Sequence, residues 1–216
     1  MTELRATYDR ILAETHALYR QRSAELRHRG YFVMYGPLLD RPPIVFVGYQ
    51  PGGNQTDPEL ANRPPQPDLP VESFYATDDW KLAVVMRKLW GRELLAASTG
   101  LNAIFVRSPR IDVFEREVPK HTRRAIEQFC VPKVAELVEA MRPELVVAIG
   151  FRTLELFSKT EPVLWNAKGR ALVKRGMIGR MPAIATLHLS GSRIAAADLE
   201  AIGSFVVDQL GKAELQ

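Results

Sequence analysis

The sequence predicts an α/β fold, a three-layer α/β/α sandwich around a central, mostly parallel, four-stranded sheet. Two observations lead to this expectation. Short apolar runs bounded by Gly and Pro recur along the 216 residues, as buried strands do. Segments with apolar residues at helical spacing separate most of these runs, and this alternation is typical of a parallel sheet covered by helices. No repeat marks a boundary, so we expect one domain over residues 1–216 with its core at about 30–210.

The composition excludes several classes of protein. Cys130 is the only cysteine, which excludes an internal disulfide, a Cys-based zinc site and an iron–sulfur cluster held by four thiolates. Lys and Arg outnumber Asp and Glu by 29 to 25, and the pI near 9.3 permits a polyanionic partner without requiring one. No apolar segment approaches the roughly 20 residues of a membrane-spanning helix. We expect a cytoplasmic monomer that needs neither metal nor cofactor and does not contact membranes.

The first half of the chain contains two helical segments around one strand. Thr2–Arg29 carries apolar residues at helical spacing and is followed by a glycine stop signal. Ile44–Val47 is an apolar run that ends in Gly and Pro, which predicts a buried strand. Repeated prolines in Asp57–Phe74 exclude a long helix and favour an irregular excursion. Trp80–Trp90 then returns to helical spacing.

The second half repeats the alternation of strand and helix. Leu101–Val106 is the second expected strand, and Lys120–Met141 is an amphipathic helix that Pro132 should kink or divide. Glu144–Gly150 is the clearest strand in the sequence and leads directly into a short helix, Phe151–Lys159.

The last part of the chain completes the sheet. Arg170–Gly176 leads to the fourth expected strand, Ala183–Leu187. Ala195–Leu210 closes the fold as an amphipathic helix. With this element the predicted order of strands and helices is that of a parallel sheet with helices packed against it.

Three loops should meet at one edge of the sheet, because the carboxyl ends of parallel strands lie together and open α/β sheets bind ligands there. They are Gly48–Asn54 ("GYQPGGN"), Arg107–Arg110 ("RSPR") with Asn102 on the strand before it, and His188–Arg193 ("HLSGSR"). Together these segments supply two side-chain amides, an imidazole, small hydroxyls and several arginines. The side chains concerned are Gln50, Asn102, His188, Ser190, Ser192, Arg107, Arg110 and Arg193.

The order and spacing of these motifs resemble the uracil-DNA glycosylase superfamily. The resemblance covers about Ile44 to Arg193 and rests on a "G-x-x-P-G" turn, an Asn in the second strand and an "H-x-S-G-x-R" loop. The two glycines after the proline are closest in style to the single-strand-selective and mismatch-specific branches. The resemblance implies a uracil-DNA glycosylase-like fold, hydrolysis of the N-glycosidic bond of a uracil or other deaminated base, and DNA as the partner, as in base excision repair.

The resemblance also implies roles for residues of the pocket. Asn102 would read the Watson–Crick edge of an extruded base, and His188 would donate a hydrogen bond to the base oxygen on which negative charge develops. Gln50 would position the attacking water, although the family has Asp or Asn there and an amide cannot take a proton. The remaining substrate-binding residues would be Gly48, Tyr49, Pro51 and Gly52, with Phe74 or Tyr75 stacking on the base.

A further group of residues would contact the DNA. Ser190, Gly191 and Ser192 permit a close approach of backbone to phosphate, and Arg193 or Ile194 would fill the gap left by the extruded base. The second loop would add Arg107 and Ser108. Leu189 stands where the family has a proline.

The residues alone leave other interpretations open. His188 could be a structural histidine at a strand end, and Asn102 could equally satisfy backbone groups at the sheet edge. A catalytically silent relative could bind nucleic acid or a free base through the same cleft. A sugar- or nucleotide-phosphate enzyme is a third possibility, whereas the Gly-rich turn lacks the Lys-Ser/Thr of an ATP-binding P-loop.

Overall fold

The computed structural model describes residues 2–65, 69–190 and 194–213. They form an α/β fold built on one mixed sheet with strand order β2-β1-β3-β6-β5-β4. The strands are β1 (Ile44–Gly48), β2 (Thr99–Asn102), β3 (Leu145–Ile149), β4 (Glu161–Trp165), β5 (Ala171–Ile178) and β6 (Met181–Thr186). The helices are α1 (Thr2–Arg22), η1 (Leu60–Asn62), α2 (Phe74–Thr77), α3 (Lys81–Ala97), α4 (Ile111–Glu117), α5 (Lys120–Met141), α6 (Phe151–Glu155) and α7 (Ala196–Ala213).

The sheet differs from the prediction, because it has six strands in place of four. The four expected strands correspond to β1, β2, β3 and β6, which pair in parallel. β5 and β4 extend the sheet in antiparallel fashion beyond β6. β4 was not predicted because it is short, largely exposed and contains Pro162. Proline in a sheet is confined to edge strands of this kind.

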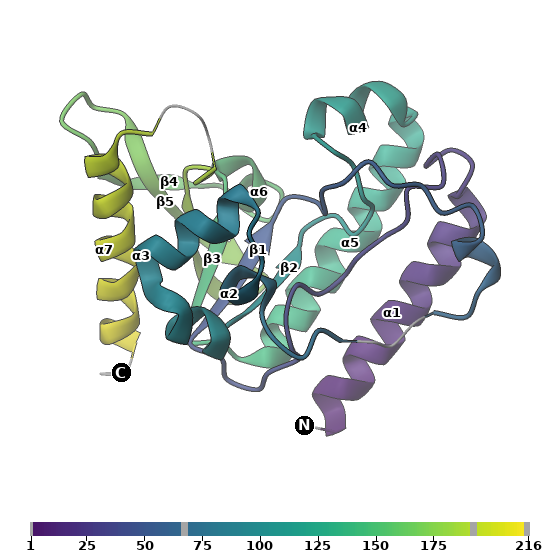
Figure 1. Cartoon of the computed structure of the whole chain (residues 1–216), viewed down its shortest axis with the longest axis horizontal. Coiled ribbons are helices and arrows are strands. Elements are labelled where there is room, and N and C mark those ends of the chain that lie inside the picture. Colours follow the sequence, from purple (N-terminus) through teal and green to yellow (C-terminus); the bar gives the residue numbers. More distant parts are fainter. Residues whose placement is uncertain (1, 66–68, 191–193, 214–216) are drawn as a thin grey trace.

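Helices cover both faces of the sheet (Figure 1), with α1 and α5 on one side and α3 and α7 on the other. Side chains of a strand point alternately to its two faces. Accordingly, Val45 and Val47 of β1 join the core under α1 and α5, whereas Ile44 and Phe46 join the core under α3 and α7. Because β1 is buried on both faces, it reads in sequence as a continuous apolar run.

Several boundaries also differ from the expected ones. α1 ends at Arg22, and residues 23–28 form turns in which Arg27 and His28 adopt positive φ. β2 ends at Asn102, since its partner β1 ends at the paired residue Gly48. Asn102 is therefore the last residue of its strand, whereas the sequence placed it near the start.

The predicted helices agree with the structure to different degrees. α5 spans the predicted range without division, so the expectation that Pro132 could split it is wrong. α3 continues beyond Trp90 to Ala97, with a non-helical backbone at Gly91. Among the described residues, no helix is both long and apolar enough to cross a membrane.

Candidate functional site

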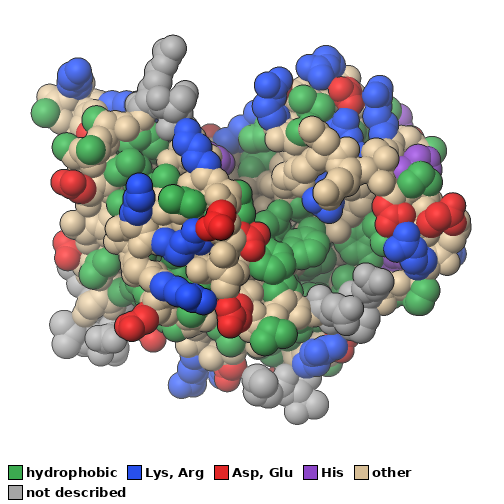
Figure 2. All heavy atoms as spheres, in the orientation of Figure 1, with side chains coloured by type: hydrophobic (Ala, Val, Ile, Leu, Met, Phe, Trp, Pro, Cys, Tyr) green, Lys and Arg blue, Asp and Glu red, His purple; other side chains and the backbone are tan. Residues whose placement is uncertain are grey.

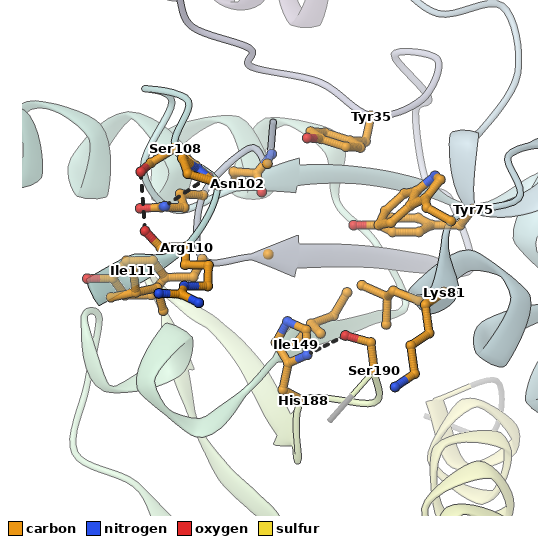
Figure 3. Close-up of a pocket in the computed structure, with 17 residues that line it drawn as sticks. Tyr35, Tyr75, Lys81, Asn102, Ser108, Arg110, Ile111, Ile149, His188 and Ser190 are labelled. Carbon is orange, nitrogen blue, oxygen red and sulfur yellow. Dashed lines mark hydrogen bonds between the residues drawn. The ribbon is translucent and has the colours of Figure 1, made fainter. Parts of the chain in front are cut away.

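A pocket of about 290 Å³ lies at the carboxyl ends of β1, β2 and β6. Gln50, Asn102 and His188 all line it, so the three predicted loops do meet at one edge of the sheet. In Figure 3, Tyr35 and Asn102 lie on one side of a central hollow and His188 and Ser190 on the opposite side. Tyr75 lies at one end of this hollow, and Arg110 and Ile111 lie at the other. This volume is near the lower end of small-molecule sites, roughly 300–1,000 Å³.

Asn102 is fixed in the pocket wall by the pairing of β1 with β2. It lies opposite Gly48 in the parallel register, and a Cβ atom at position 48 would come within 2.6 Å of its Oδ1. Gly48 is thus required for Asn102 to adopt this position. The Asn102 side chain is buried, with 3% of the residue exposed, and its Nδ2 makes no hydrogen bond of normal geometry, although the Tyr35 hydroxyl lies near the Asn102 amide. An unpartnered buried amide donor costs free energy in the unbound protein, as is common for groups held ready for a ligand.

Gln50 presents a hydrogen-bond acceptor to the same pocket. Its Nε2 donates to the backbone oxygen of Ser108 at 3.2 Å, which fixes the orientation of the amide. Its Oε1 is buried and has no partner. The side chain can therefore accept a hydrogen bond from a water or a ligand, but it cannot remove a proton.

His188 lies at the accessible wall of the pocket. Its Nδ1 is 3.0 Å from Oγ of Ser190, and Figure 3 shows this contact as a dashed line. Surrounding protein atoms desolvate the ring, which lowers the pKa of His188 below its ordinary value although part of the ring remains exposed. The imidazole is therefore neutral at neutral pH, and when Ser190 donates to Nδ1 the other ring nitrogen carries the proton.

Two tyrosines form an aromatic wall. Tyr75 is 2% exposed and lies so closely over Gly100 that no side chain fits at that glycine. The Tyr75 and Tyr35 rings are stacked, with centroids 6.2 Å apart and planes inclined by 19°. Burial raises the pKa of both hydroxyls, so both remain protonated. Of the two predicted stacking residues, Tyr75 lines this pocket, whereas Phe74 lines a neighbouring cavity.

The rim of the pocket is cationic. Lys81, at the start of α3, and Arg110, just before α4, both line it. Arg110 is paired with Asp112 at 2.8 Å, while Lys81 has no ion pair within the described part of the chain. Figure 2 shows a hollow between the regions of α3 and α4, with Lys and Arg side chains on both of its rims. No Asp or Glu is among the described residues that line the pocket.

Hydrogen bonds from the second loop, Arg107–Arg110, hold the first loop, Gly48–Asn54, in place. Ser108 is 1% exposed, its Oγ accepts a hydrogen bond from Nη1 of Arg29 at 3.0 Å, and its backbone N–H donates to Pro51 at 2.9 Å. Ser108 also lines the pocket, but its polar groups hold the loops together, and its contact with DNA stays a prediction. Arg107 donates to the carbonyl of Gly52 at 3.2 Å, so its side chain lies across the glycine turn.

The other predicted site residues have mixed positions. Tyr49 and Gly52 line the pocket, whereas Pro51 is buried and is not part of the lining. Ile194 is partly buried against the core under α3 and α7, outside the pocket lining. Three further predicted residues lie outside the described part of the chain, namely Gly191, Ser192 and Arg193.

Several lining residues were not predicted, among them Tyr35, Trp80 and Lys81. None of these three follows a strand. Tyr35 enters the site because its segment lies along β2, where its backbone N–H donates to the oxygen of Gly100 at 2.6 Å. The only available signal was the aromatic residue in a turn-forming "YGP" sequence, which is weak.

The site offers amides, an imidazole and aromatic rings as its binding chemistry. Within residues 2–65, 69–190 and 194–213, no three His, Cys, Asp or Glu side chains come together as ligands of a metal ion would. The sequence matches no protein-family model and no curated protein. The proposal below therefore depends on the geometry of the pocket and on the motif resemblance.

Proposed function

We propose that this protein is a DNA glycosylase of the uracil-DNA glycosylase type, which removes a uracil or another deaminated base from DNA. One observation carries the proposal: the unpartnered donor of Asn102, the unpartnered acceptor of Gln50 and the neutral imidazole of His188 line one pocket. The motif resemblance supports the proposal, because it assigns the base-binding and water-positioning roles to residues of these three loops.

Base recognition would depend on Asn102 and the aromatic wall. A side-chain amide offers a donor and an acceptor side by side, which matches the exocyclic oxygen and the ring N–H of a uracil edge. The buried Nδ2 of Asn102 gains its missing partner when that oxygen enters the pocket. Tyr75 and Tyr35 provide apolar surface beside the base. Gly52 leaves space for larger bases, since a Cβ at this position would meet nothing within 4 Å.

Hydrolysis would use His188 and Gln50 in different ways. The bond between the sugar and the base breaks, and its electron pair leaves with the base, where charge collects on a carbonyl oxygen. The N–H of neutral His188 stabilises that charge, and water forms the new bond to the sugar carbon. Gln50 accepts a hydrogen bond from this water, whose proton passes to solvent because the amide cannot take it.

An excision assay tests the proposal. Stoichiometric protein is incubated with single-stranded and duplex DNA that contains uracil, hypoxanthine or xanthine, and abasic sites are revealed by strand cleavage in alkali. We expect abasic sites with at least one of these bases, and strongly reduced release with His188→Ala. Absence of abasic sites on every substrate would contradict the catalytic role.

A second candidate is a catalytically silent protein that binds nucleic acid or a free base through the same pocket. The observation that favours it is the lack of a carboxylate among the described lining residues, where a glycosylase usually activates its water. It predicts binding of DNA with an extrudable base, weakened by Asn102→Ala, and no release of that base. The excision assay and a binding assay on the same substrates therefore distinguish the two candidates.

A further inference from the structure

A second cavity, of about 480 Å³, lies beside the candidate pocket. Its lining includes the rings of Phe32, Tyr35, Phe74 and Trp80, all of which are partly exposed. Partly exposed aromatic rings grouped in one cavity are not required by the core of a small domain and are typical of a binding surface. None of the predicted roles in DNA contact accounts for Phe32 or Trp80.

Tyr35 forms the wall between the two cavities. One face of its ring is stacked on Tyr75, which lines only the first cavity. The Tyr35 ring also meets Phe32 and Phe74 edge-on, with centroids 5.1 Å and 5.8 Å away, and the Phe32 and Phe74 rings stack on each other with centroids 5.9 Å apart. The two cavities also share Gly52 and Trp80. A ligand in the candidate pocket could therefore continue into the aromatic cavity without leaving the surface of the protein.

The polar groups of this aromatic cavity are paired within the chain. The Trp80 indole donates to the carboxylate of Asp78 at 3.0 Å. Arg107 is held across the turn by Gly52 and by Oε1 of Gln55 at 3.3 Å. The cavity thus presents aromatic rings, the fixed guanidinium of Arg107 and the carboxylate of Asp78. The rings and the guanidinium suit a flat aromatic ligand attached to an anionic backbone.

We propose that the aromatic cavity is a second base subsite, which stacks the nucleobase next to the extruded one in single-stranded DNA. This inference rests on the proposed function of the first pocket. Stacking on aromatic side chains tolerates every base, so this subsite adds affinity without adding sequence preference. In a duplex the neighbouring base is already stacked and paired, and it must give up those contacts to enter the cavity. The subsite therefore favours single-stranded substrates.

Oligonucleotide binding tests the subsite from the DNA side. The probe is a short, fluorescently labelled single strand with one deoxyuridine whose sugar carries fluorine, which slows loss of the base. In two further strands the neighbouring nucleotide, on one side or the other, is replaced by an abasic sugar. For the native protein we expect one of these replacements to weaken binding about 10-fold, in the range of a lost base–aromatic stack.

Substitutions of the aromatic residues test the same contact in the protein. Phe32→Leu and Phe74→Leu should each weaken binding of the intact strand, and the abasic neighbour should then cause little additional loss, because the two changes remove the same contact. Trp165→Leu is the matched control, since this ring is 54% exposed on the edge strand β4. Thermal unfolding of each variant shows whether it is folded.

The outcomes separate the subsite from the proposed function. If binding depends on deoxyuridine over thymidine but neither abasic neighbour weakens it, the subsite is wrong and the proposed function stands. If binding is the same with deoxyuridine and thymidine, the proposed function fails and the subsite fails with it. A loss on one side that disappears in the two Phe variants supports the subsite, even if one of those variants is too unstable to measure.

Discussion

At the scale of single residues, Asn102 gives the clearest way to separate function from structure. A structural asparagine would use its amide to satisfy buried groups, yet Nδ2 of Asn102 has no partner. We predict that Asn102→Ala weakens binding of target DNA at least ~10-fold, while the free energy of unfolding changes by less than ~1 kcal/mol. Fluorescence anisotropy and urea denaturation measure the two effects. A large loss of stability would favour the structural interpretation.

His188 gives a prediction about pH. Desolvation lowers the pKa of His188, so the neutral ring persists to a pH below the ordinary histidine value of about 6.5. We predict that base release is constant at neutral pH and declines as pH falls through this lowered pKa. Protonation of Nδ1 would remove the acceptor of the hydrogen bond from the Ser190 hydroxyl. The rate profile and an NMR titration of the ring should give the same pKa. A rate that rises on acidification would contradict a neutral donor.

The sequence allowed Gln50, Asn102 and His188 to be grouped, because each lies on or just after a strand that could be recognised. The surroundings of Ser108 could not be predicted: a hydroxyl in an arginine-containing loop suggests phosphate contact, but burial and the hydrogen bond from Arg29 could not be deduced from one sequence. Tyr35 was missed because it reaches the site through tertiary pairing with β2.

At the scale of elements, the pairing of β1 with β2 controls the pocket. A Cβ at Gly48 would lie 2.6 Å from Oδ1 of Asn102, so Gly48→Ala must displace that side chain. We predict that Gly48→Ala weakens DNA binding about as much as Asn102→Ala, and that the double variant is no weaker than either, since both remove one interaction.

A binding cycle over the four proteins measures this coupling. Gly211→Ala on α7 is the control, because a Cβ there would meet nothing within 4 Å. Additive losses for Gly48→Ala and Asn102→Ala would show that Gly48 acts on the pocket by another route.

Elements were predictable to the extent that local pattern decides them. The buried parallel strands and α5 have strong apolar patterns, and the sequence located them. β4 has an exposed pattern with Pro162, and α4 is only one to two turns long, so neither has a periodicity that distinguishes it from a loop. The ends of β2 depend on where its partner β1 ends, which is tertiary information.

At the scale of the whole molecule, stability should depend on pH through His16 on α1. This side chain is 6% exposed, its Nδ1 lies 3.0 Å from the Tyr31 hydroxyl, and burial lowers its pKa. Burial also raises the pKa of Tyr31 to about 12, so that hydroxyl stays protonated. The unfolded chain therefore takes up a proton near pH ~6.5 that the folded protein resists.

Stability is accordingly complete above that pH and falls as the pH decreases toward the lowered pKa of folded His16. We predict a decrease in melting temperature between pH ~6.5 and ~5, and a shallower decrease in His16→Gln. Scanning calorimetry across this range measures both. An unchanged slope in the variant would show that other groups, His188 among them, cause the dependence.

The central claim is that the pocket formed by Gln50, Asn102 and His188 receives an extruded base. The most direct measurement is the NMR signal of the Asn102 side-chain amide during titration with a single strand that contains the fluorinated deoxyuridine. We predict a downfield shift of one amide proton as Nδ2 gains its partner, and no such shift with a strand that is abasic at that position. If the strand binds while the Asn102 amide signal stays unchanged, the base is not in this pocket and the claim is wrong.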